Sequence, residues 1–359
     1  MTSRADDEKF MTRALEVSRL HAGLTDTNPS VGCIIVKNGE IIAEAVTAIG
    51  GRPHAERQAL EIAGEAARGA TAYVTLEPCA HFGRTPPCAN ALVDFGIARV
   101  VVAVDDPDER VSGRGNQILR DAGIEVETGV LRQESKRALA GYLTRKLKKR
   151  PHVIVKIAVS ADGMIGRLGG GQVAITGPEA RHAVHLLRAR CDAILVGLGT
   201  AAADDPELTV RISGLEHRSP VRIVMDRRLE LPLSSKLVRT ARDVPVVAVA
   251  GIETDLVSRR EALMAAGVDV LETSTLADLL AVLAERGMSE LLVEGGARVA
   301  KAFLEAGLVD RILLFESRVV VGEGGVESPL QRADIPQEYT FVGETAYGPD
   351  RCFEFERPL

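Results

Sequence analysis

The strongest restriction on the fold is a regular alternation of strand-like and helix-like segments. The stretches 100–104, 153–159 and 193–196 are short and rich in Val, Ile or Leu, whereas 54–67 and 178–190 carry apolar residues at helical spacing. Such alternation is typical of α/β proteins, in which helices cover a sheet. We therefore predict an α/β fold.

A tight hairpin is predicted near the start of the chain. Residues 31–36 and 41–45 read as strands, and Lys37-Asn38-Gly39-Glu40 separates them. The central Asn-Gly pair favours a primed turn, which joins neighbouring antiparallel strands. The two strands should therefore pair directly.

The chain is long enough for two domains. A single core becomes unusual beyond about 250–300 residues, and this chain has 359. A dense cationic run at 145–150 precedes Pro151, and cations of this kind suit the solvated end of a helix. We take this run as the boundary and predict domains at residues 1–147 and 151–359.

Charge and composition point to a small partner. The chain has 44 Lys and Arg against 50 Asp and Glu, a net charge of −6, and no basic stripe, so we expect no nucleic-acid partner. Aromatic residues are only 3% and Trp is absent, which leaves few anchors for a bilayer interface. The first turn is charged and no uncharged apolar run approaches about 20 residues. We expect no signal peptide, no membrane partner and a cytoplasmic location.

The strongest chemical signal is one histidine and two cysteines in the first half. His54 and Cys88 start predicted helices, and Cys79 follows a predicted strand. One imidazole and two thiolates are good zinc ligands, and three protein ligands leave the fourth tetrahedral position for water. Glu56, two residues after His54, is placed to move protons without binding the metal. This arrangement is the zinc deaminase signature, with eight residues between the cysteines instead of two.

The remaining candidates for metal binding are weaker. His81 is the spare candidate for a fourth ligand, which would close the site to water. The five cysteines are too few and too scattered for a disulfide framework. Four residues are interpreted as packed side chains: His21, Cys33, Cys191 and Cys352.

Longer motifs go beyond a general deaminase pattern. The segments Asn28-Pro29-Ser30-Val31-Gly32-Cys33 and His54-Ala55-Glu56, and the run Glu77-Pro78-Cys79-Ala80-His81-Phe82-Gly83-Arg84-Thr85-Pro86-Pro87-Cys88, resemble the bifunctional deaminase/reductases of riboflavin biosynthesis. The resemblance continues through Gly113-Arg114-Gly115 and covers nearly the whole chain. It implies an N-terminal cytidine-deaminase-like αβα domain followed by a dihydrofolate-reductase-like α/β domain.

The same resemblance implies the reaction of the first domain. The substrate would be 2,5-diamino-6-ribosylamino-4(3H)-pyrimidinone 5′-phosphate, a small pyrimidine nucleotide, deaminated on its ring with Zn²⁺. Asn28 would contact the pyrimidine, and His81 and Arg84 would add polar contacts. A guanidinium such as that of Arg84 suits a phosphate. The alternatives are a surface loop charge for Arg84 and loop scaffolding for His81.

After the linker, Lys156-Ile157-Ala158-Val159-Ser160-Ala161-Asp162-Gly163 resembles the start of the family's reductase domain. The resemblance implies hydride transfer from NADPH to the ribosyl group, which would give a ribityl chain. The implied cofactor-binding residues are Ala158, Thr200, Asp204, Gly296, Ala297 and Arg298. The implied substrate-binding residues are Arg188, Leu208, Arg211 and Glu294.

Two features of the second half complicate this interpretation. Many relatives carry Ser and Trp where this chain has Gln172 and Ala174, so an aromatic side chain near the cofactor is missing. Gly197-Leu198-Gly199 also resembles a Rossmann fingerprint, with Asp226 at the end of the next predicted strand. Arg227 and Arg228 would then favour a 2′-phosphate, hence NADPH, and a solvated turn is the alternative.

Three hypotheses follow from these residues. The first is an enzyme with two sequential active sites. The second is a deaminase of free or polynucleotide bases fused to an inert domain, and the third is a zinc-stabilised binding module without catalysis. Whether the chain forms a homo-oligomer is left open.

Overall fold

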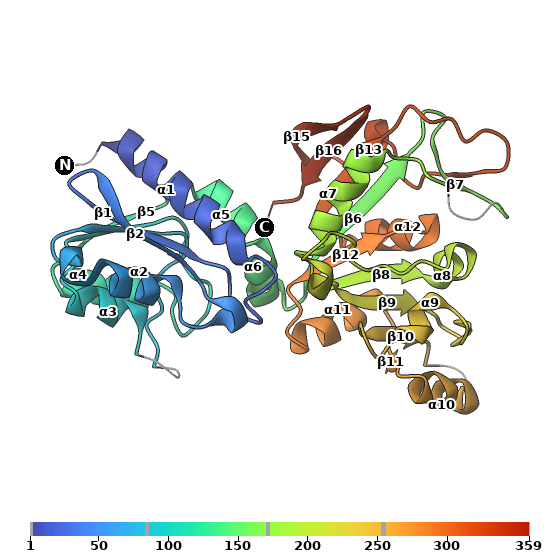
Figure 1. Cartoon of the computed structure of the whole chain (residues 1–359), viewed down its shortest axis with the longest axis horizontal. Coiled ribbons are helices and arrows are strands. Elements are labelled where there is room, and N and C mark those ends of the chain that lie inside the picture. The colour runs from blue at the N-terminus through green and yellow to red at the C-terminus, as the bar shows by residue number, and fades with distance from the viewer. Residues whose placement is uncertain (1–2, 83–85, 170–172, 253–255, 359) are drawn as a thin grey trace. The chain divides into compact units, whose positions relative to one another are not determined.

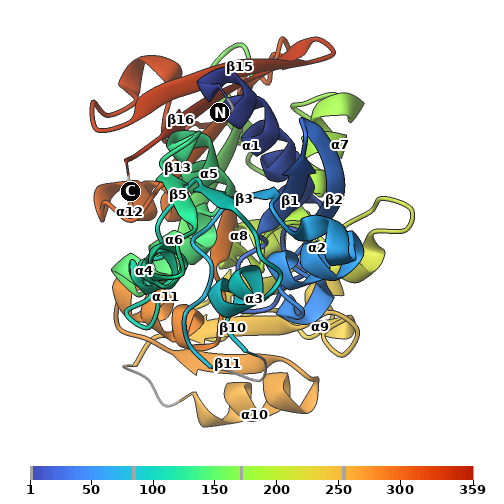
Figure 2. The ribbon, with the colours of Figure 1, turned by 90° about the vertical axis from the view of Figure 1, so that its left-hand side faces the viewer.

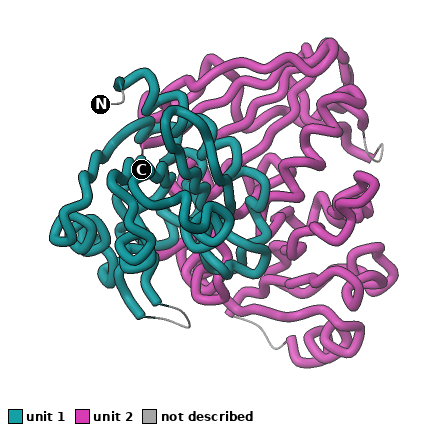
Figure 3. The backbone as a smooth tube through the Cα atoms, turned by 60° about the vertical axis from the view of Figure 1, so that its left-hand side comes forward, with its two compact units in different colours: residues 1–148 teal, residues 149–359 magenta. Residues whose placement is uncertain are grey.

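The chain forms two compact units, Met1–Lys148 and Lys149–Leu359 (Figure 3). The computed structural model describes residues 3–82, 86–169, 173–252 and 256–358. Each unit has its own main sheet and its own buried core.

Unit 1 is built on a five-stranded sheet of order β2-β1-β3-β4-β5. Its strands are β1 (Gly32–Lys37), β2 (Glu40–Val46), β3 (Thr71–Val74), β4 (Arg99–Val102) and β5 (Glu125–Thr128). β1 pairs antiparallel with β2 and β3, whereas β3, β4 and β5 run parallel. Because β3 and β4 are parallel, the loops after them leave the sheet at the same edge.

The predicted hairpin is present between β1 and β2. Lys37 pairs with Glu40 in the antiparallel register. Asn38 and Gly39, which form the turn, have φ of 52° and 80°. Positive φ at both central residues is the requirement of a primed turn, which explains the preference for Asn-Gly.

Helices cover both faces of this sheet (Figure 1). α1 and α5 pack together on one face, and α2, α3 and α4 lie on the other, as Figure 2 also shows. The helices of unit 1 are α1 (Arg4–Ser18), α2 (Ala55–Ala63), α3 (Cys88–Asp94), α4 (Arg114–Asp121), α5 (Arg132–Ala138) and α6 (Ala140–Lys148). The result is a three-layered αβα domain, with a core drawn from both faces of the sheet.

Unit 2 is built on a nine-stranded sheet of order β11-β10-β9-β8-β12-β6-β13-β16-β15. The strands from β11 to β13 in this order run parallel, and β16 and β15 add an antiparallel edge. The strands are β6 (His152–Val159), β8 (Ala193–Gly197), β9 (Val221–Met225), β10 (Val246–Ala250), β11 (Asp269–Glu272), β12 (Glu290–Glu294), β13 (Arg311–Glu316), β15 (Thr340–Tyr347) and β16 (Asp350–Glu356). A separate pair consists of β7 (Met164–Arg167) and β14 (Gly325–Glu327).

Two hydrophobic clusters cover the two faces of the large sheet. One contains buried side chains of α7, α8, α9 and α10, and the other contains those of α11 and α12. The helices are α7 (Pro178–Arg188), α8 (Leu198–Asp204), α9 (Lys236–Arg239), α10 (Val257–Ala265), α11 (Leu276–Glu285) and α12 (Ala297–Glu305). None of the helices in the described ranges combines the length and hydrophobicity needed to cross a bilayer.

The predicted α/β class is confirmed, but sequence patterning did not single out several elements. The edge strand β15 and its neighbour β16 were missed because exposed and half-exposed residues interrupt their apolar pattern. The short strand β11 was missed as well, since its four residues begin and end with an acidic side chain. β11 and β15 are the two end strands of the sheet and pair on one side only, whereas β16 lies between β13 and β15.

Candidate active sites

One imidazole and two thiols of unit 1 come together, although 34 residues separate the first from the last. His54 is the residue that precedes α2, Cys79 lies in the loop after β3, and Cys88 is the first residue of α3. One ligand atom from each lies within 4.8 Å of the others. The structure therefore assembles the predicted group from two helix N-termini and one loop.

The spacing of these atoms fits a tetrahedral zinc ion. His54 Nδ1 lies 3.6 Å from Cys79 Sγ and 3.4 Å from Cys88 Sγ. Bonds of about 2.3 Å to sulfur and about 2.05 Å to nitrogen give a tetrahedral N to S edge of about 3.5 Å. The donor set also fits, because soft thiolates with an imidazole are typical of zinc.

The two sulfur atoms differ in their affinity for protons. Hydrogen bonds from Cys88 and from His54 lower the pKa of the Cys79 thiol to about 4, against the effect of burial. The pKa of the Cys88 thiol is raised, first by its hydrogen bond with Cys79 and second by burial. One thiolate therefore forms readily in this chain, whereas a second one needs a cation close by, which a bound zinc ion provides.

Glu56 lies beside this group in the first turn of α2, with only 3% of its surface exposed. Burial is the main cause that raises the pKa of this carboxyl group to about 7, while His54 opposes the shift. A buried carboxylate needs a positive partner. A cation bound by the adjacent metal ligands would be such a positive partner.

His81 does not join the ligand group. Among the residues that the structure describes, the metal-ligand cluster contains His54, Cys79 and Cys88 alone. The buried Nδ1 atom of His81 has no hydrogen-bond partner in the described part of the chain. The site thus keeps three protein ligands, and His81 offers a polar atom for another molecule.

Asn28 and Arg84 are the other two residues predicted to contact the pyrimidine nucleotide. Asn28 ends a turn in which its N–H donates to Thr25 O at 3.0 Å. Its side chain lies against Gly51, since a Cβ at that glycine would come within 2.4 Å of Asn28 Nδ2. Arg84 lies outside the described residues.

Glu77 has a positioning role that the motif did not reveal. Its carboxylate is buried and accepts backbone N–H groups of Asp106 at 3.2 Å, Gly113 at 3.0 Å and Asn116 at 3.2 Å. Because Glu77 is two residues before Cys79, these bonds attach the loop after β4 and the start of α4 to the metal-ligand segment. The signal in the sequence was a glutamate placed directly after a predicted apolar strand.

In unit 2, the residues predicted for NADPH gather at the carboxyl ends of neighbouring parallel strands. β8 and β12 are adjacent, and each leads directly into a turn and a helix. Thr200 lies against the second of these turns, since a Cβ at Gly296 would be 3.1 Å from Thr200 Oγ1. This edge of the sheet, where glycine turns meet helix N-termini, is the usual place for a dinucleotide phosphate.

The remaining NADPH candidates lie close to these strands. Ala297 and Arg298 form the first turn of α12 after Gly296, and the Arg298 side chain is exposed. Ala158 lies near the end of β6, the strand next to β12. Asp204 ends α8, and burial raises the pKa of its carboxyl group. Gln172 lies outside the described residues, and Ala174 is exposed.

The predicted substrate residues of unit 2 include a buried ion pair. Arg188 donates two hydrogen bonds to the Glu294 carboxylate, at 2.7 and 2.9 Å, and a third to Thr209 O at 3.2 Å. The bond to Thr209 O connects the pair to the segment that carries Leu208 and Arg211. Leu208 is buried and Arg211 is exposed. Burial raises the pKa of the Glu294 carboxyl group, but the charge of Arg188 outweighs that effect, so its pKa is lowered.

Two further groups lie at this pair. Lys156 stands opposite Glu294 in the register of β6 and β12, and burial lowers the pKa of its ammonium group. In the sequence, Lys156 belongs to the segment that resembles the reductase domain, but the resemblance predicted no role for it. His185 accepts a hydrogen bond from the Arg211 N–H at 3.3 Å, and burial followed by the charges of Arg188 and Arg211 lowers its pKa to about 4. His185 is therefore neutral at pH 7.

The Rossmann interpretation of Asp226 is wrong. This residue is fully buried, and its two carboxylate oxygens accept the N–H groups of Glu230 at 2.9 Å and Leu231 at 2.7 Å. Its carboxylate stabilises the loop that follows it and is not accessible to a ribose. Arg227 and Arg228 beside it are exposed.

The cationic run ends α6 as predicted, but it is exposed only in part, at Lys148 and Lys149. Arg145 donates to the carbonyl oxygen of Thr27, and Lys146 pairs with Asp108 at 2.8 Å. Within unit 2, Arg150 forms a bidentate pair with buried Asp310. Sequence patterning missed these contacts because each partner is more than 35 residues away.

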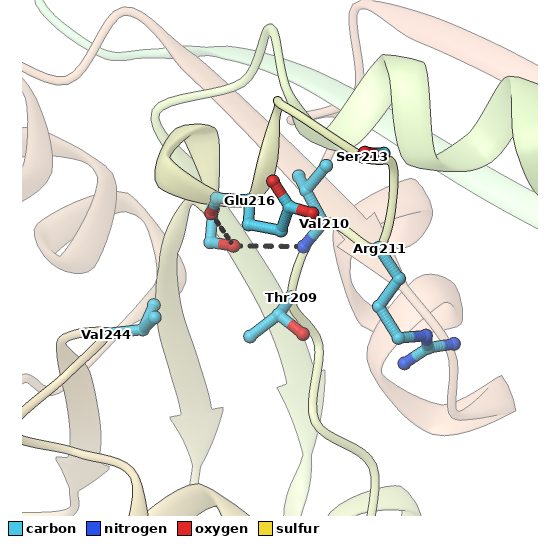
Figure 4. A pocket seen from close by; sticks show the side chains of 7 residues that line it. Thr209, Val210, Arg211, Ser213, Glu216 and Val244 are labelled. Carbon is cyan, nitrogen blue, oxygen red and sulfur yellow. Dashed lines mark hydrogen bonds between the residues drawn. The ribbon is translucent and has the colours of Figure 1, made fainter.

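A surface pocket of about 530 Å³ lies beside the segment that follows Leu208 (Figure 4). It is lined by Thr209, Val210, Arg211, Ser213, Glu216, Ser219 and Val244. Arg211 is the predicted site residue among them, and Figure 4 shows its guanidinium directed away from Val244. The pocket is therefore at the margin of the predicted reductase site and does not contain the Arg188 and Glu294 pair.

Comparison with known proteins identifies the family. Residues 151–353 match the family model described as the RibD C-terminal domain, and residues 4–104 match the cytidine and deoxycytidylate deaminase zinc-binding region. The chain is 42% identical over 323 residues to riboflavin biosynthesis protein RibD of Aquifex aeolicus, which covers 89% of each chain. The chain belongs to the RibD family.

Other RibD proteins agree with this assignment over nearly the full length. The RibD of Escherichia coli K12 is 38% identical, with 96% of this chain and 98% of the relative covered. The structure of Acinetobacter baumannii RibD superposes with a TM-score of 0.87 at 34% identity, covering 99% of this chain and all of that one. A Thermotoga maritima structure named as a diaminohydroxyphosphoribosylaminopyrimidine deaminase/5-amino-6-(5-phosphoribosylamino)uracil reductase gives the same TM-score and identity, covering 99% of both chains.

Membership of the RibD family confirms the first of the three hypotheses. The protein is an enzyme, a bifunctional deaminase and reductase of riboflavin biosynthesis. It has a zinc-binding deaminase domain of the cytidine deaminase type and a RibD reductase domain, and its cofactors are zinc and NADPH. An inert second domain and a binding module without catalysis are both wrong.

Proposed function

We propose that unit 1 deaminates 2,5-diamino-6-ribosylamino-4(3H)-pyrimidinone 5′-phosphate and that unit 2 then reduces its ribosyl group. The product would be 5-amino-6-(5-phospho-D-ribitylamino)uracil. The observation that carries this proposal is the group of His54, Cys79 and Cys88 with Glu56 buried beside it. The activities in the name of the Thermotoga maritima structure support the choice of substrate.

For the deamination, we assign the metal-ligand role to His54, Cys79 and Cys88. A zinc ion, when bound, supplies a Lewis acid that lowers the pKa of water. Glu56 would accept a proton from the attacking water, deliver it to the ring nitrogen, and protonate the departing ammonia. Its place in the first turn of α2, next to His54, holds it beside the ligand group.

The nucleotide itself would be held by three side chains. Asn28 lies against the segment that leads to His54, and His81 presents a buried nitrogen that lacks a partner among the described residues. Both are therefore suited to contact the pyrimidine ring. Arg84 is proposed to bind the phosphate, for which its guanidinium is suited.

For the reduction, we propose that NADPH binds along the turns after β8 and β12. Thr200, Asp204, Ala158 and the segment from Gly296 to Arg298 would contact the cofactor, which supplies the hydride. Arg188, Glu294, Leu208 and Arg211 would face the nucleotide. Lys156 joins them as a substrate contact, because its ammonium group is buried opposite Glu294.

The two assignments predict that one substitution separates the activities. Glu56→Gln keeps the shape of the side chain but removes its ability to move protons. Loss of a general acid–base lowers a rate by about 10²- to 10⁴-fold, so ammonia release should fall by that amount. NADPH oxidation with the pre-deaminated intermediate should be unchanged.

Both reactions are measured on the full chain, by ammonia production and by NADPH consumption. Equal loss of the two activities would contradict separate sites. Ammonia release at the wild-type rate would contradict the role of Glu56. We also propose a cytoplasmic location, where the nucleotide and NADPH are available. Whether the chain forms a homo-oligomer is tested by light scattering.

A further inference from the structure

Three side chains on one face of α6 contact two separate loops of unit 1. Tyr142, Arg145 and Lys146 are spaced i, i+3 and i+4, which places them next to one another on a helix. The Lys146 ammonium lies 5.7 Å from the centre of the Tyr142 ring. We call the group of Tyr142, Arg145 and Lys146 the α6 clamp.

The first of the two loops is 105–113, which follows β4. The Tyr142 hydroxyl donates to the Asp106 carboxylate, whose oxygens lie at 2.9 and 3.1 Å, and Lys146 pairs with Asp108 at 2.8 Å. Both aspartates are buried. The α6 clamp therefore holds this loop through two charged groups that are shielded from water.

The same loop is attached to the Cys79 segment from its other side. Glu77 accepts the N–H groups of Asp106 and Gly113. The start of α4 also touches this segment, since a Cβ at Gly115 would lie 2.0 Å from Pro78 O. Loop 105–113 is thus held between α6 and the residues that carry one metal ligand.

The second loop is 25–28, which carries Asn28. Arg145 donates to the carbonyl oxygen of Thr27, and the Thr25 hydroxyl donates to Asn28 O at 2.7 Å. A Cβ at Gly51 would come within 2.7 Å of Thr25 O, so this loop packs on the segment that ends at His54. Each loop contacted by the α6 clamp therefore lies against a segment with a metal ligand.

We propose that Tyr142, Arg145 and Lys146 are positioning residues of the deaminase site, through which α6 sets loops 25–28 and 105–113 around the metal-ligand group. The α6 clamp touches neither the metal ligands nor Glu56 in the contacts that the structure describes, and the bonds of Glu77 and the contact of Gly115 with Pro78 hold the Cys79 segment without it. We therefore assign the clamp to substrate placement and not to metal binding or proton transfer. A displacement of about 1 Å in a binding loop can lower kcat/KM by up to about 10²-fold. This proposal rests on the assignment of deamination to unit 1.

The test is the steady-state kinetics of deamination by the full-length holoenzyme carrying Lys146→Met. The variant removes one charge and leaves Asp108 with Arg110, an exposed partner at 2.7 Å. We expect KM for the diaminopyrimidine nucleotide to rise about tenfold with kcat within about twofold of wild type, because ground-state binding is lost and the chemistry is not. Zinc content, thermal midpoint and NADPH oxidation with the pre-deaminated intermediate should match wild type.

Three further variants make the result specific. Lys146→Arg restores a cation at the same position and should recover most of the wild-type KM. Lys148→Met removes the same charge from an exposed position of the same helix and should leave KM within about twofold of wild type. Arg145→Met addresses the other loop and should also raise KM.

Three results would overturn the positioning role. The first is a wild-type KM in Lys146→Met and in Arg145→Met. The second is a parallel fall of kcat, zinc content and thermal midpoint, which would show a purely structural contact. The third is an equal rise of KM in Lys148→Met. A wild-type chain that releases no ammonia from this nucleotide would instead overturn the proposed function, and the positioning role with it.

Discussion

At the scale of single residues, burial decides which charges matter. The Arg188 and Glu294 side chains are only 12% and 10% exposed and form a bidentate pair, whereas Arg351 and Glu344 form a pair at 62% and 36% exposure. Breaking a buried pair leaves a charge without solvent or partner and costs about 3–5 kcal/mol. An exposed pair contributes about 0–1 kcal/mol, because water replaces the partner.

This contrast gives a prediction for two matched substitutions. Arg188→Met should lower the free energy of unfolding of unit 2 by about 3 kcal/mol, at the low end of the range because Lys156 remains near Glu294. Arg351→Met should change it by less than about 1 kcal/mol. Denaturant unfolding of the full-length variants measures both values, and equal effects would show that the buried pair has no special energetic role.

At the scale of elements, close backbone contacts place the metal ligands. Cys79 lies in a loop after β3, and this loop needs a support on the side of α4. Gly115 in the first turn of α4 provides it, since only a residue without a side chain lets the helix approach Pro78 O. The supporting contacts of Glu77 act at the same place.

We therefore predict that Gly115→Ala damages the deaminase site specifically. A Cβ placed 2.0 Å from a carbonyl oxygen forces a backbone shift, because neither atom belongs to a flexible side chain. Zinc content and ammonia release should fall by more than about tenfold, while NADPH oxidation persists. Gly343→Ala is the control, as a Cβ there meets no atom within 4 Å. Full zinc content in Gly115→Ala would show that α4 does not position Cys79.

At the scale of the whole molecule, the two chemistries are carried by separate cores. The zinc-ligand group and the residues around it belong to unit 1, and the predicted NADPH and reductase residues belong to unit 2. Each unit has its own sheet, so the geometry of one site does not depend on strands of the other. Removing a ligand from one unit should therefore affect one reaction.

Metal removal tests this independence in the intact protein. Treatment with a zinc chelator, followed by its removal, should abolish ammonia release and leave NADPH oxidation with the pre-deaminated intermediate unchanged. Adding Zn²⁺ back should restore deamination, because the ligand group belongs to a folded sheet with a large apolar core. Loss of both activities, or failure of zinc to restore the first, would count against separate sites.

Residue chemistry and local pattern carried much of the prediction. The α/β class followed from strand and helix periodicity, and the β1–β2 hairpin followed from Asn38 and Gly39, whose positive φ values are a local requirement. The grouping of His54, Cys79 and Cys88 was also accessible, because few residue types bind zinc and each lies at the end of a local element. In all these cases the information lies in the residue types and in the local pattern around each of them.

The remaining features depend on contacts between residues far apart in the chain. Lys156 and Glu294 are neighbours only because β6 pairs with β12, and the cations of α6 reach Thr27 and Asp108 only after the sheet of unit 1 has formed. Asp226 shows the converse, since burial gave a polar residue at a strand end a purely structural role. Sequence alone therefore determined the chemical groups and the local elements, whereas the tertiary structure decided which charges are buried together, because desolvation depends on the whole surrounding fold.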